Sequence, residues 1–267
     1  MNNYLGIFDS GIGGISVLKR VLERHGDLPC LYLADTARVP FGDKNPSEIR
    51  LIASELANWL KEKNVSIVLV ACNTTNSLAL DLVKKISDVP VFDLISSTAM
   101  LIKESRVGVL ATPATVASGS YSSAIKSKKP GTYVIEQGCP AFVELIEAGK
   151  LDGEEINFAA KEYLSPLLNA EVESIVMGCS HYPFLGPVLR QLLPSHVRLV
   201  DPAIGLASCL DELIGDGQRS EKTPITFANT SFCTTSSPKC FSRKLRTFIG
   251  KSPQVDMVSL RSKAYFF

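Results

Sequence analysis

Two cysteines lie in matching contexts in two distant segments of the chain. Residues 67–74 (IVLVACNT) and 174–181 (SIVMGCSH) each contain an apolar run, a cysteine and small polar residues. An ionised thiol is both a nucleophile and a proton acceptor. Because Cys72 and Cys179 occupy equivalent places in two similar segments, they predict a near-symmetric site. Such a site suits a reaction whose substrate and product are mirror images.

The apolar runs before both cysteines are typical of strands buried in a parallel sheet. Each cysteine then falls at the carboxyl end of a strand, where open α/β sheets bind their ligands. A helix N-terminus at that edge lowers the pKa of a thiol, so we expect both thiols to be reactive. The alternative for any single cysteine is a buried structural thiol, which is the commoner case. The matched pair argues against it.

Polar residues near the cysteines supply further groups for proton transfer. His181 is expected to favour the thiolate of Cys179, and its alternative role is that of a hydrogen-bonded structural imidazole. Asp9 precedes a Gly-rich turn and has a helix N-cap as its alternative role. Helix starts provide backbone N–H groups that bind carboxylates, and we expect such starts after Ser10, Asn73 and Ser180.

Strand-like runs alternate with helical segments along most of the chain. We predict strands at 4–8, 31–34, 67–71, 91–94, 107–111, 133–136, 175–177 and 197–200. Residues 46–63 begin with a proline and then show helical periodicity, which predicts an amphipathic helix. Strands that alternate with helices in this way predict a doubly wound α/β fold.

The repeated cysteine segment divides the chain into two similar halves. We place the first α/β domain at residues 1–95 plus 206–267 and the second at 96–205. In the tail we expect a helix from about residue 206, a strand at 225–228, a basic helix around 242–248 and a strand near 255–260. This tail is expected to pack back on the first domain.

Charge and composition exclude several classes of partner. The 267 residues include 28 basic and 27 acidic side chains, for a formal net charge of +1. No overall field therefore attracts nucleic acid or an anionic membrane. The chain starts without a secretion-signal pattern, and its apolar runs are shorter than the roughly 20 residues of a membrane helix. Seven cysteines without a C-x-x-C pair fit a reducing compartment, so we expect a cytoplasmic protein.

The sequence carries no recognisable cofactor motif. The Gly-rich residues 11–14 do not match G-x-G-x-x-G, which argues against a dinucleotide. Nothing indicates the Schiff-base lysine of a pyridoxal enzyme with its partners. Cysteine and histidine residues are scattered rather than set at metal-ligand spacing. We therefore expect neither a cofactor nor a metal.

Six strings resemble, in the same order, the motifs of bacterial glutamate racemases. They are DSGIGG (9–14), ADTARVPFG (34–42), ACNTT (71–75), TPATVASGSY (112–121), CPAFVELIEAG (139–149) and GCSHYP (178–183). One such string alone is weak, because Gly-rich loops are common. Six in register are specific, and together they cover the chain from about residue 4 to 205.

The resemblance implies two α/β domains related by a pseudo-twofold axis, with the active site in the cleft between them. It implies the interconversion of L- and D-glutamate, which supplies D-glutamate for peptidoglycan, without pyridoxal phosphate or metal. Glutamate is then the small-molecule partner, and a homodimer is left open.

The site residues also follow from the resemblance. Cys72 and Cys179 match the two catalytic cysteines, with Cys72 taking the proton of D-glutamate and Cys179 that of L-glutamate. The positions that match groups assisting catalysis are Asp9, Glu147 and His181. The positions that match substrate contacts are Asp9, Ser10, Phe41, Gly42, Asn73, Thr74, Thr115, Ser180 and His181.

The chain departs from the commonest form of the motifs at three positions. Phe41 replaces a tyrosine, Thr75 an alanine and Ser180 a threonine. Phenylalanine is harmless if the contact at position 41 runs through the backbone, and serine keeps the hydroxyl at position 180.

Three rival functions are set beside a glutamate racemase. They are an aspartate or other amino-acid racemase, a one-cysteine enzyme of the same superfamily, and a non-catalytic amino-acid-binding protein. The pair of cysteines argues against the last two. Aspartate racemases tend to carry glutamate at the position of His181.

Overall fold

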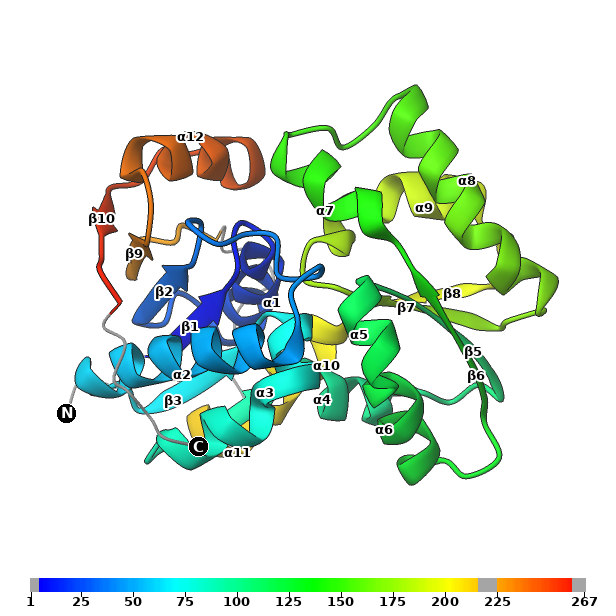
Figure 1. Ribbon diagram of the computed structural model, residues 1–267, viewed down its shortest axis with the longest axis horizontal. Coiled ribbons are helices and arrows are strands. Elements are labelled where there is room, and N and C mark those ends of the chain that lie inside the picture. Colours follow the sequence, from blue (N-terminus) through cyan, green and yellow to red (C-terminus); the bar gives the residue numbers. More distant parts are fainter. Residues whose placement is uncertain (1–4, 216–224, 261–267) are drawn as a thin grey trace.

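The computed structural model describes residues 5–215 and 225–260, in which two separate parallel sheets form (Figure 1). The larger sheet has the strand order β10-β9-β2-β1-β3-β4. Its strands are β1 (Leu5–Asp9), β2 (Cys30–Ala34), β3 (Ile67–Val70), β4 (Val91–Asp93), β9 (Thr230–Thr234) and β10 (Val255–Met257). The smaller sheet has the order β6-β5-β7-β8. Its strands are β5 (Arg106–Ala111), β6 (Tyr133–Gly138), β7 (Ser174–Gly178) and β8 (Arg198–Val200).

Helices follow most of the strands, and several begin at a side chain that caps them. Asn45, Asp93, Thr112, Asp201 and Ser237 each accept a hydrogen bond from a backbone N–H in the first turn. The longer helices are α1 (Gly14–His25), α2 (Pro46–Glu62), α3 (Asn73–Ile86), α8 (Glu154–Asn169) and α12 (Pro238–Ile249). The shorter ones are α4 (Leu94–Leu101), α5 (Pro113–Ser118), α6 (Ser120–Lys128), α7 (Pro140–Glu147), η1 (Tyr182–Leu185), α9 (Gly186–Leu192), α10 (Pro202–Cys209) and α11 (Asp211–Ile214).

Both faces of the larger sheet are buried. Successive residues of a strand point to opposite faces, and Ile7 and Phe8 of β1 belong to two different apolar clusters. The cluster that contains Phe8 also holds the inward sides of α2 and α3, whereas the cluster that contains Ile7 includes Leu18 of α1. Helices on both sides of a parallel sheet confirm the predicted α/β fold.

The tail differs from its prediction at one strand. Residues 225–228 do not form the expected strand, and pairing begins at Thr230, where β9 joins β2. Phe227 has a positive φ of 56°, which an extended strand does not allow. The backbone N–H and hydroxyl of Thr226 also bind the Asp27 carboxylate. An apolar run therefore becomes a turn because its backbone groups bind a side chain instead of a neighbouring strand.

Two packed helices lie where the chain passes between the sheets. α4 follows β4, the last strand of the larger sheet before the chain enters the smaller one, and α10 follows β8, the last strand of the smaller sheet. They approach closely at Gly205, where a Cβ would lie 2.6 Å from the carbonyl oxygen of Ser97. The expected domain limits near 95 and 205 fall at these helices and stay a prediction. In the described residues, no helix is long and apolar enough to cross a membrane.

Candidate active site

Both cysteines line one small cavity between the two sheets. Cys72 follows β3 of the larger sheet, and Cys179 follows β7 of the smaller one. The cavity has a volume of about 10 Å³, which is room for about one water molecule. Its lining residues are Ser10, Phe41, Gly42, Cys72, Asn73, Thr74, Thr112, Val143, Cys179, Ser180 and His181. The two strand ends that the sequence predicted to be equivalent therefore face each other.

Cys72 is a fully buried thiol at the N-cap of α3. Burial, together with the nearby carboxylate of Asp9, raises the pKa of Cys72 to about 12. A backbone N–H from Thr75 opposes that rise. The expectation that the helix N-terminus lowers the pKa of this thiol was wrong, because desolvation outweighs the helix. Cys72 is therefore protonated at neutral pH.

Cys179 has an imidazole as its neighbour instead of a carboxylate. The Sγ atom of Cys179 lies 3.8 Å from Nδ1 of His181. The other ring nitrogen of His181, Nε2, lies 2.9 Å from Oε1 of Glu147 at the end of α7. Glu147 is distant in sequence but belongs to the same site. Thiol, imidazole and carboxylate thus form one hydrogen-bonded row.

This row holds His181 in its charged form. Complete burial alone would lower the pKa of His181, but its hydrogen bonds to Cys179 and Glu147 raise it well above 6.5. Burial alone would raise the pKa of Glu147. The hydrogen bond and charge of His181, together with the hydrogen bond of Lys244, instead hold the pKa of this carboxyl at about 2. The row therefore places an imidazolium within hydrogen-bond distance of the sulfur of Cys179.

Asp9 connects the two halves of the site. Its Oδ1 accepts a hydrogen bond of 2.9 Å from the backbone N–H of Gly11, and its Oδ2 accepts one of 2.9 Å from the hydroxyl of Ser180. Helix α1 begins at Gly14 with Gly13 as its N-cap, so the alternative role of Asp9 as a helix N-cap was wrong. Of the helix starts expected after Ser10, Asn73 and Ser180, α3 begins at Asn73 itself, α1 begins at Gly14 and the 3₁₀ helix η1 begins at Tyr182.

The amide of Asn73 presents an unpaired donor to the cavity. Its Oδ1 accepts a hydrogen bond of 2.6 Å from the hydroxyl of Tyr121, whereas its buried Nδ2 has no partner. An amide whose oxygen is fixed in this way must turn its NH₂ group in the other direction. A buried unpaired donor is costly, so this one is suited to a ligand.

Three threonines form a hydroxyl cluster on the wall of the cavity. Oγ1 of Thr112 lies 3.1 Å from that of Thr74 and 3.0 Å from that of Thr115. Thr112 and Thr74 line the cavity, and Thr115 lies behind them. Opposite them, Gly42 packs so closely that a Cβ would lie 2.8 Å from the Cβ of Thr112. Phe41 is buried beside it.

Four residues of the site were not among the predicted ones. Thr112 and Val143 line the cavity, Tyr121 orients Asn73, and Lys244 pairs with Glu147. The first three lie inside the strings 112–121 and 139–149, where the N-cap role of a threonine before proline was a usable signal. Lys244 lies in the basic helix of the tail, and nothing local in the sequence indicates its partner.

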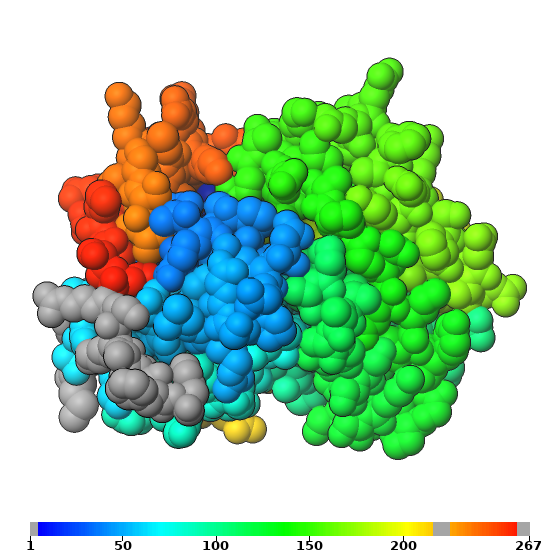
Figure 2. Space-filling view, viewed as in Figure 1, coloured from blue at the N-terminus to red at the C-terminus, as the bar shows by residue number. Residues whose placement is uncertain are grey.

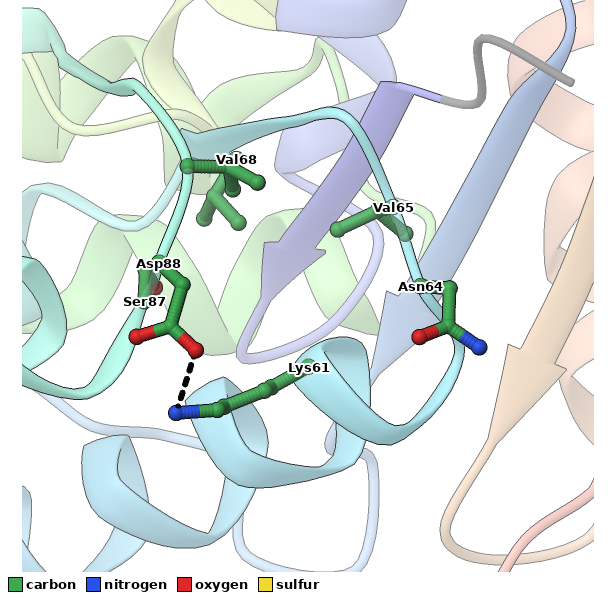
Figure 3. Close-up of a pocket in the computed structure, with 7 residues that line it drawn as sticks. Lys61, Asn64, Val65, Val68, Ser87 and Asp88 are labelled. Atoms are coloured by element: carbon green, nitrogen blue, oxygen red, sulfur yellow. Dashed lines mark ion pairs between the residues drawn. The ribbon is translucent and has the colours of Figure 1, made fainter. Parts of the chain in front are cut away.

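The described residues give less support to a metal site or to a site in a second cavity. In the described parts of the chain, no group of three or more histidine, cysteine or acidic residues is arranged to hold a metal ion. A second cavity of about 230 Å³ is larger than the one between the cysteines (Figure 3). Its charged residues, Lys61 and Asp88, pair with each other at 2.7 Å across it. It lies beside the start of β3, at the opposite end of the strand from Cys72.

Comparisons with known proteins identify the family of this chain. The sequence profile of the Asp/Glu/Hydantoin racemase family matches residues 13–209. A glutamate racemase of Synechococcus sp. (strain CC9605) is 51% identical over 95% of this chain and 96% of its own length. The crystal structure of a Francisella tularensis glutamate racemase in complex with D-glutamate is 32% identical, with a TM-score of 0.87. The superposition covers 98% of this chain and 99% of the Francisella tularensis chain.

A more distant structure shares only the fold with this chain. The aspartate racemase of Picrophilus torridus superposes over 80% of this chain and 94% of its own with a TM-score of 0.57 and 15% identity, a likeness of fold alone. The profile match and the long, highly identical alignments go beyond fold. Cofactor-independent glutamate racemases, within the Asp/Glu/hydantoin racemase family, are the group to which this chain belongs.

Proposed function

We propose that this protein interconverts L- and D-glutamate by proton transfer at the α-carbon between Cys72 and Cys179. The observation that carries the proposal is that both thiols line one cavity, from two different sheets. A carbon flanked by two acid–base groups can lose a proton on one face and gain one on the other. The names of the relatives supply the substrate, and D-glutamate for peptidoglycan is the role that follows from it.

The charge of His181 beside Cys179 and the raised pKa of Cys72 support the L to D direction as the first half-cycle. The thiolate of Cys179, beside the imidazolium of His181, removes the α-proton of L-glutamate and becomes a thiol. The Cys72 thiol, whose pKa burial raises to about 12, donates its proton to the opposite face of the carbanion and becomes a thiolate. The reverse reaction exchanges the two roles, so no atom is gained or lost.

The carbanion next to a carboxylate requires preorganised hydrogen-bond donors. We assign this task to the unpaired Nδ2 of Asn73 and to the hydroxyls of Thr74 and Ser10, while the hydroxyl of Ser180 donates to Asp9. Thr115 supports them through Thr112. Asp9, Glu147 and His181 assist the thiols, and the backbone at Phe41 and Gly42 completes the wall.

A cavity of about 10 Å³ is too small for glutamate, which has ten non-hydrogen atoms. Its walls come from both sheets, so the two sheets must separate to admit the substrate and close around it. We place the two moving units at residues 1–95 with 206–267 and at 96–205. We also propose that this enzyme acts in the cytoplasm.

Incubation of the protein with L-glutamate in D₂O tests the proposal. A two-base racemase produces D-glutamate with deuterium at Cα, which chiral chromatography with mass spectrometry measures. A non-catalytic binding protein leaves both configuration and isotope unchanged. A protein that exchanges the α-proton without producing the D-enantiomer contradicts the two-base reaction.

Substrate length separates the proposal from an aspartate racemase. One methylene in a simple pocket is worth about 1–3 kcal/mol, or about 10- to 200-fold in kcat/KM. Aspartate is one methylene shorter, so it would leave some of the donors that bind the distal carboxylate without a partner. We therefore expect deuterium incorporation into L-glutamate to exceed that into L-aspartate by at least about 100-fold at equal subsaturating concentration. Comparable rates would contradict the specificity and leave the two-thiol mechanism intact.

A further inference from the structure

Helix α12 of the tail contacts the smaller sheet's half of the molecule as well as its own. Phe241 and Leu245 are buried in the core beside the larger sheet, where the ring of Phe241 lies 6.3 Å from that of Tyr32. Phe248 instead packs against Phe184 of η1, with a ring-centre distance of 4.4 Å. Figures 1 and 2 show α12 next to the segment that contains α7.

Lys244 lies on the face of α12 that meets the other half. It is one turn from Phe248, so the two side chains share a face. The Nζ atom of Lys244 forms an ion pair with Oε2 of Glu147. The side chain of Glu147 is 11% exposed and that of Lys244 is 37% exposed, so the pair lies at the rim of the site rather than in open solvent.

Glu147 belongs to the smaller sheet's half, as His181 does, but Ile12 and Lys244 of the other half also bind it. Its Oε1 accepts hydrogen bonds from His181 and, at 3.0 Å, from the backbone N–H of Ile12. Lys244 binds the remaining oxygen. With both oxygens occupied, the carboxylate has a single orientation, in which it meets Nε2 of His181.

We propose that Lys244 is a positioning residue for Cys179: it holds Glu147 against His181 and so assembles the thiol–imidazole–carboxylate row when the two halves meet. The charges alternate along the row from the ammonium of Lys244 to the carboxylate of Glu147 and the imidazolium of His181, which meets the sulfur of Cys179. Cys72 has no link to this row through Glu147, because its charged neighbour is Asp9. Lys244 therefore acts on one face of the substrate. This inference rests on the proposed racemase function.

The test requires a reaction that reports each thiol separately. Mirror-image substrates have equal free energy, so kcat/KM for racemisation stays equal in both directions in every variant. Elimination of chloride from a β-chloro analogue of glutamate is irreversible and escapes this constraint. A thiolate removes the α-proton, the C–Cl bond breaks and chloride leaves. The resulting enamine tautomerises and hydrolyses to 2-oxoglutarate and ammonia. The L-analogue reports Cys179, and the D-analogue reports Cys72.

Lys244→Met keeps the aliphatic stem and removes the charge. We expect elimination from the L-analogue to fall by about three- to tenfold, the effect of losing an ion pair that orients a reacting group. Elimination from the D-analogue should change by less than about twofold, and Lys244→Arg should restore the L-rate to within about twofold. The matched control is Lys239→Met on the same helix, an exposed lysine for which neither rate should change.

Equal losses with both analogues, or no rescue by arginine, would overturn the inference and assign α12 a general structural role. No loss with either analogue would overturn it as well. Wild-type protein that fails to racemise glutamate would instead refute the function on which the inference rests. Thermal melting of each variant separates a positioning effect from loss of fold.

Discussion

The two thiols differ more than their matching sequence segments suggest. Cys72 caps a helix of 14 residues and has the Asp9 carboxylate as its charged neighbour. Cys179 precedes a 3₁₀ turn of four residues and lies 3.8 Å from the imidazole of His181. One thiol is therefore protonated, and the other is paired with a cation. A near-symmetric scaffold can hold a proton donor and a proton acceptor at the same time, which a two-base reaction requires.

The largest predicted effect on racemisation is that of removing either thiol. Cys72→Ala and Cys179→Ala should each lower net racemisation by more than about 10³-fold, because one face then lacks a proton donor or acceptor. Polarimetry measures this loss, and far-UV circular dichroism checks the fold. Each variant should still eliminate chloride from one enantiomer of the β-chloro analogue, L for Cys72→Ala and D for Cys179→Ala. Full racemisation by either variant would refute the two-base mechanism.

Cys139 offers a matched control for the cysteine variants. It also follows a strand and caps a helix, α7, but its thiol faces the carbonyl of Gln137 at 3.5 Å and does not line the cavity. Cys139→Ala should retain racemase activity with a modest loss of stability.

Variants of the groups that assist the thiols should also affect one enantiomer of the β-chloro analogue more than the other, with smaller losses of rate. His181→Asn should lower elimination from the L-analogue by about 100-fold, and Asp9→Asn should lower elimination from the D-analogue by a similar factor. In racemisation the difference appears as unequal changes in kcat for the two directions, each of which is offset by a matching change in KM for the same direction. Similar losses for both analogues in both variants would show that the partners are not separate.

The pH dependence of Glu147→Gln tests the charge on His181. In the wild type, the pKa of His181 is raised well above 6.5, so the imidazolium persists as the pH rises past 6.5. Without the carboxylate, burial lowers the pKa of His181, so the imidazole loses its proton at a lower pH than in the wild type. We expect the L-analogue rate of the variant to fall with rising pH by up to about tenfold per unit, while the wild-type rate stays level. Parallel profiles would contradict this assignment.

The smallest predicted effect concerns Tyr121, which acts on substrate binding rather than on either thiol. Tyr121→Phe removes the hydrogen bond that orients Asn73, so KM should rise by about three- to tenfold while kcat changes by less than about twofold. Tyr163→Phe is the control, since that hydroxyl accepts from the backbone N–H of Ala141 and does not line the cavity. A fall in kcat with an unchanged KM would show that Asn73 acts in the transition state alone.

Much of the fold was predictable from local pattern. Short apolar runs and the capped start at Asn45 specify strands and α2 because these signals depend on neighbours in the chain. The strand at 225–228 was mispredicted because Asp27, distant in the sequence, binds the backbone of Thr226. Cys72 and Cys179 were found because a strand end places its next residue at the sheet edge, whatever packs around it.

What the sequence alone determined is which residues can do chemistry and that two of them are equivalent. Only the tertiary structure decided their surroundings, because Cys72 is desolvated inside the fold and Cys179 reaches Glu147 of α7 through His181. The tertiary structure also decided the pairing of Lys244 with Glu147, which is 97 residues away in the sequence. Burial and long-range charge depend on three-dimensional distance, which residue spacing does not encode.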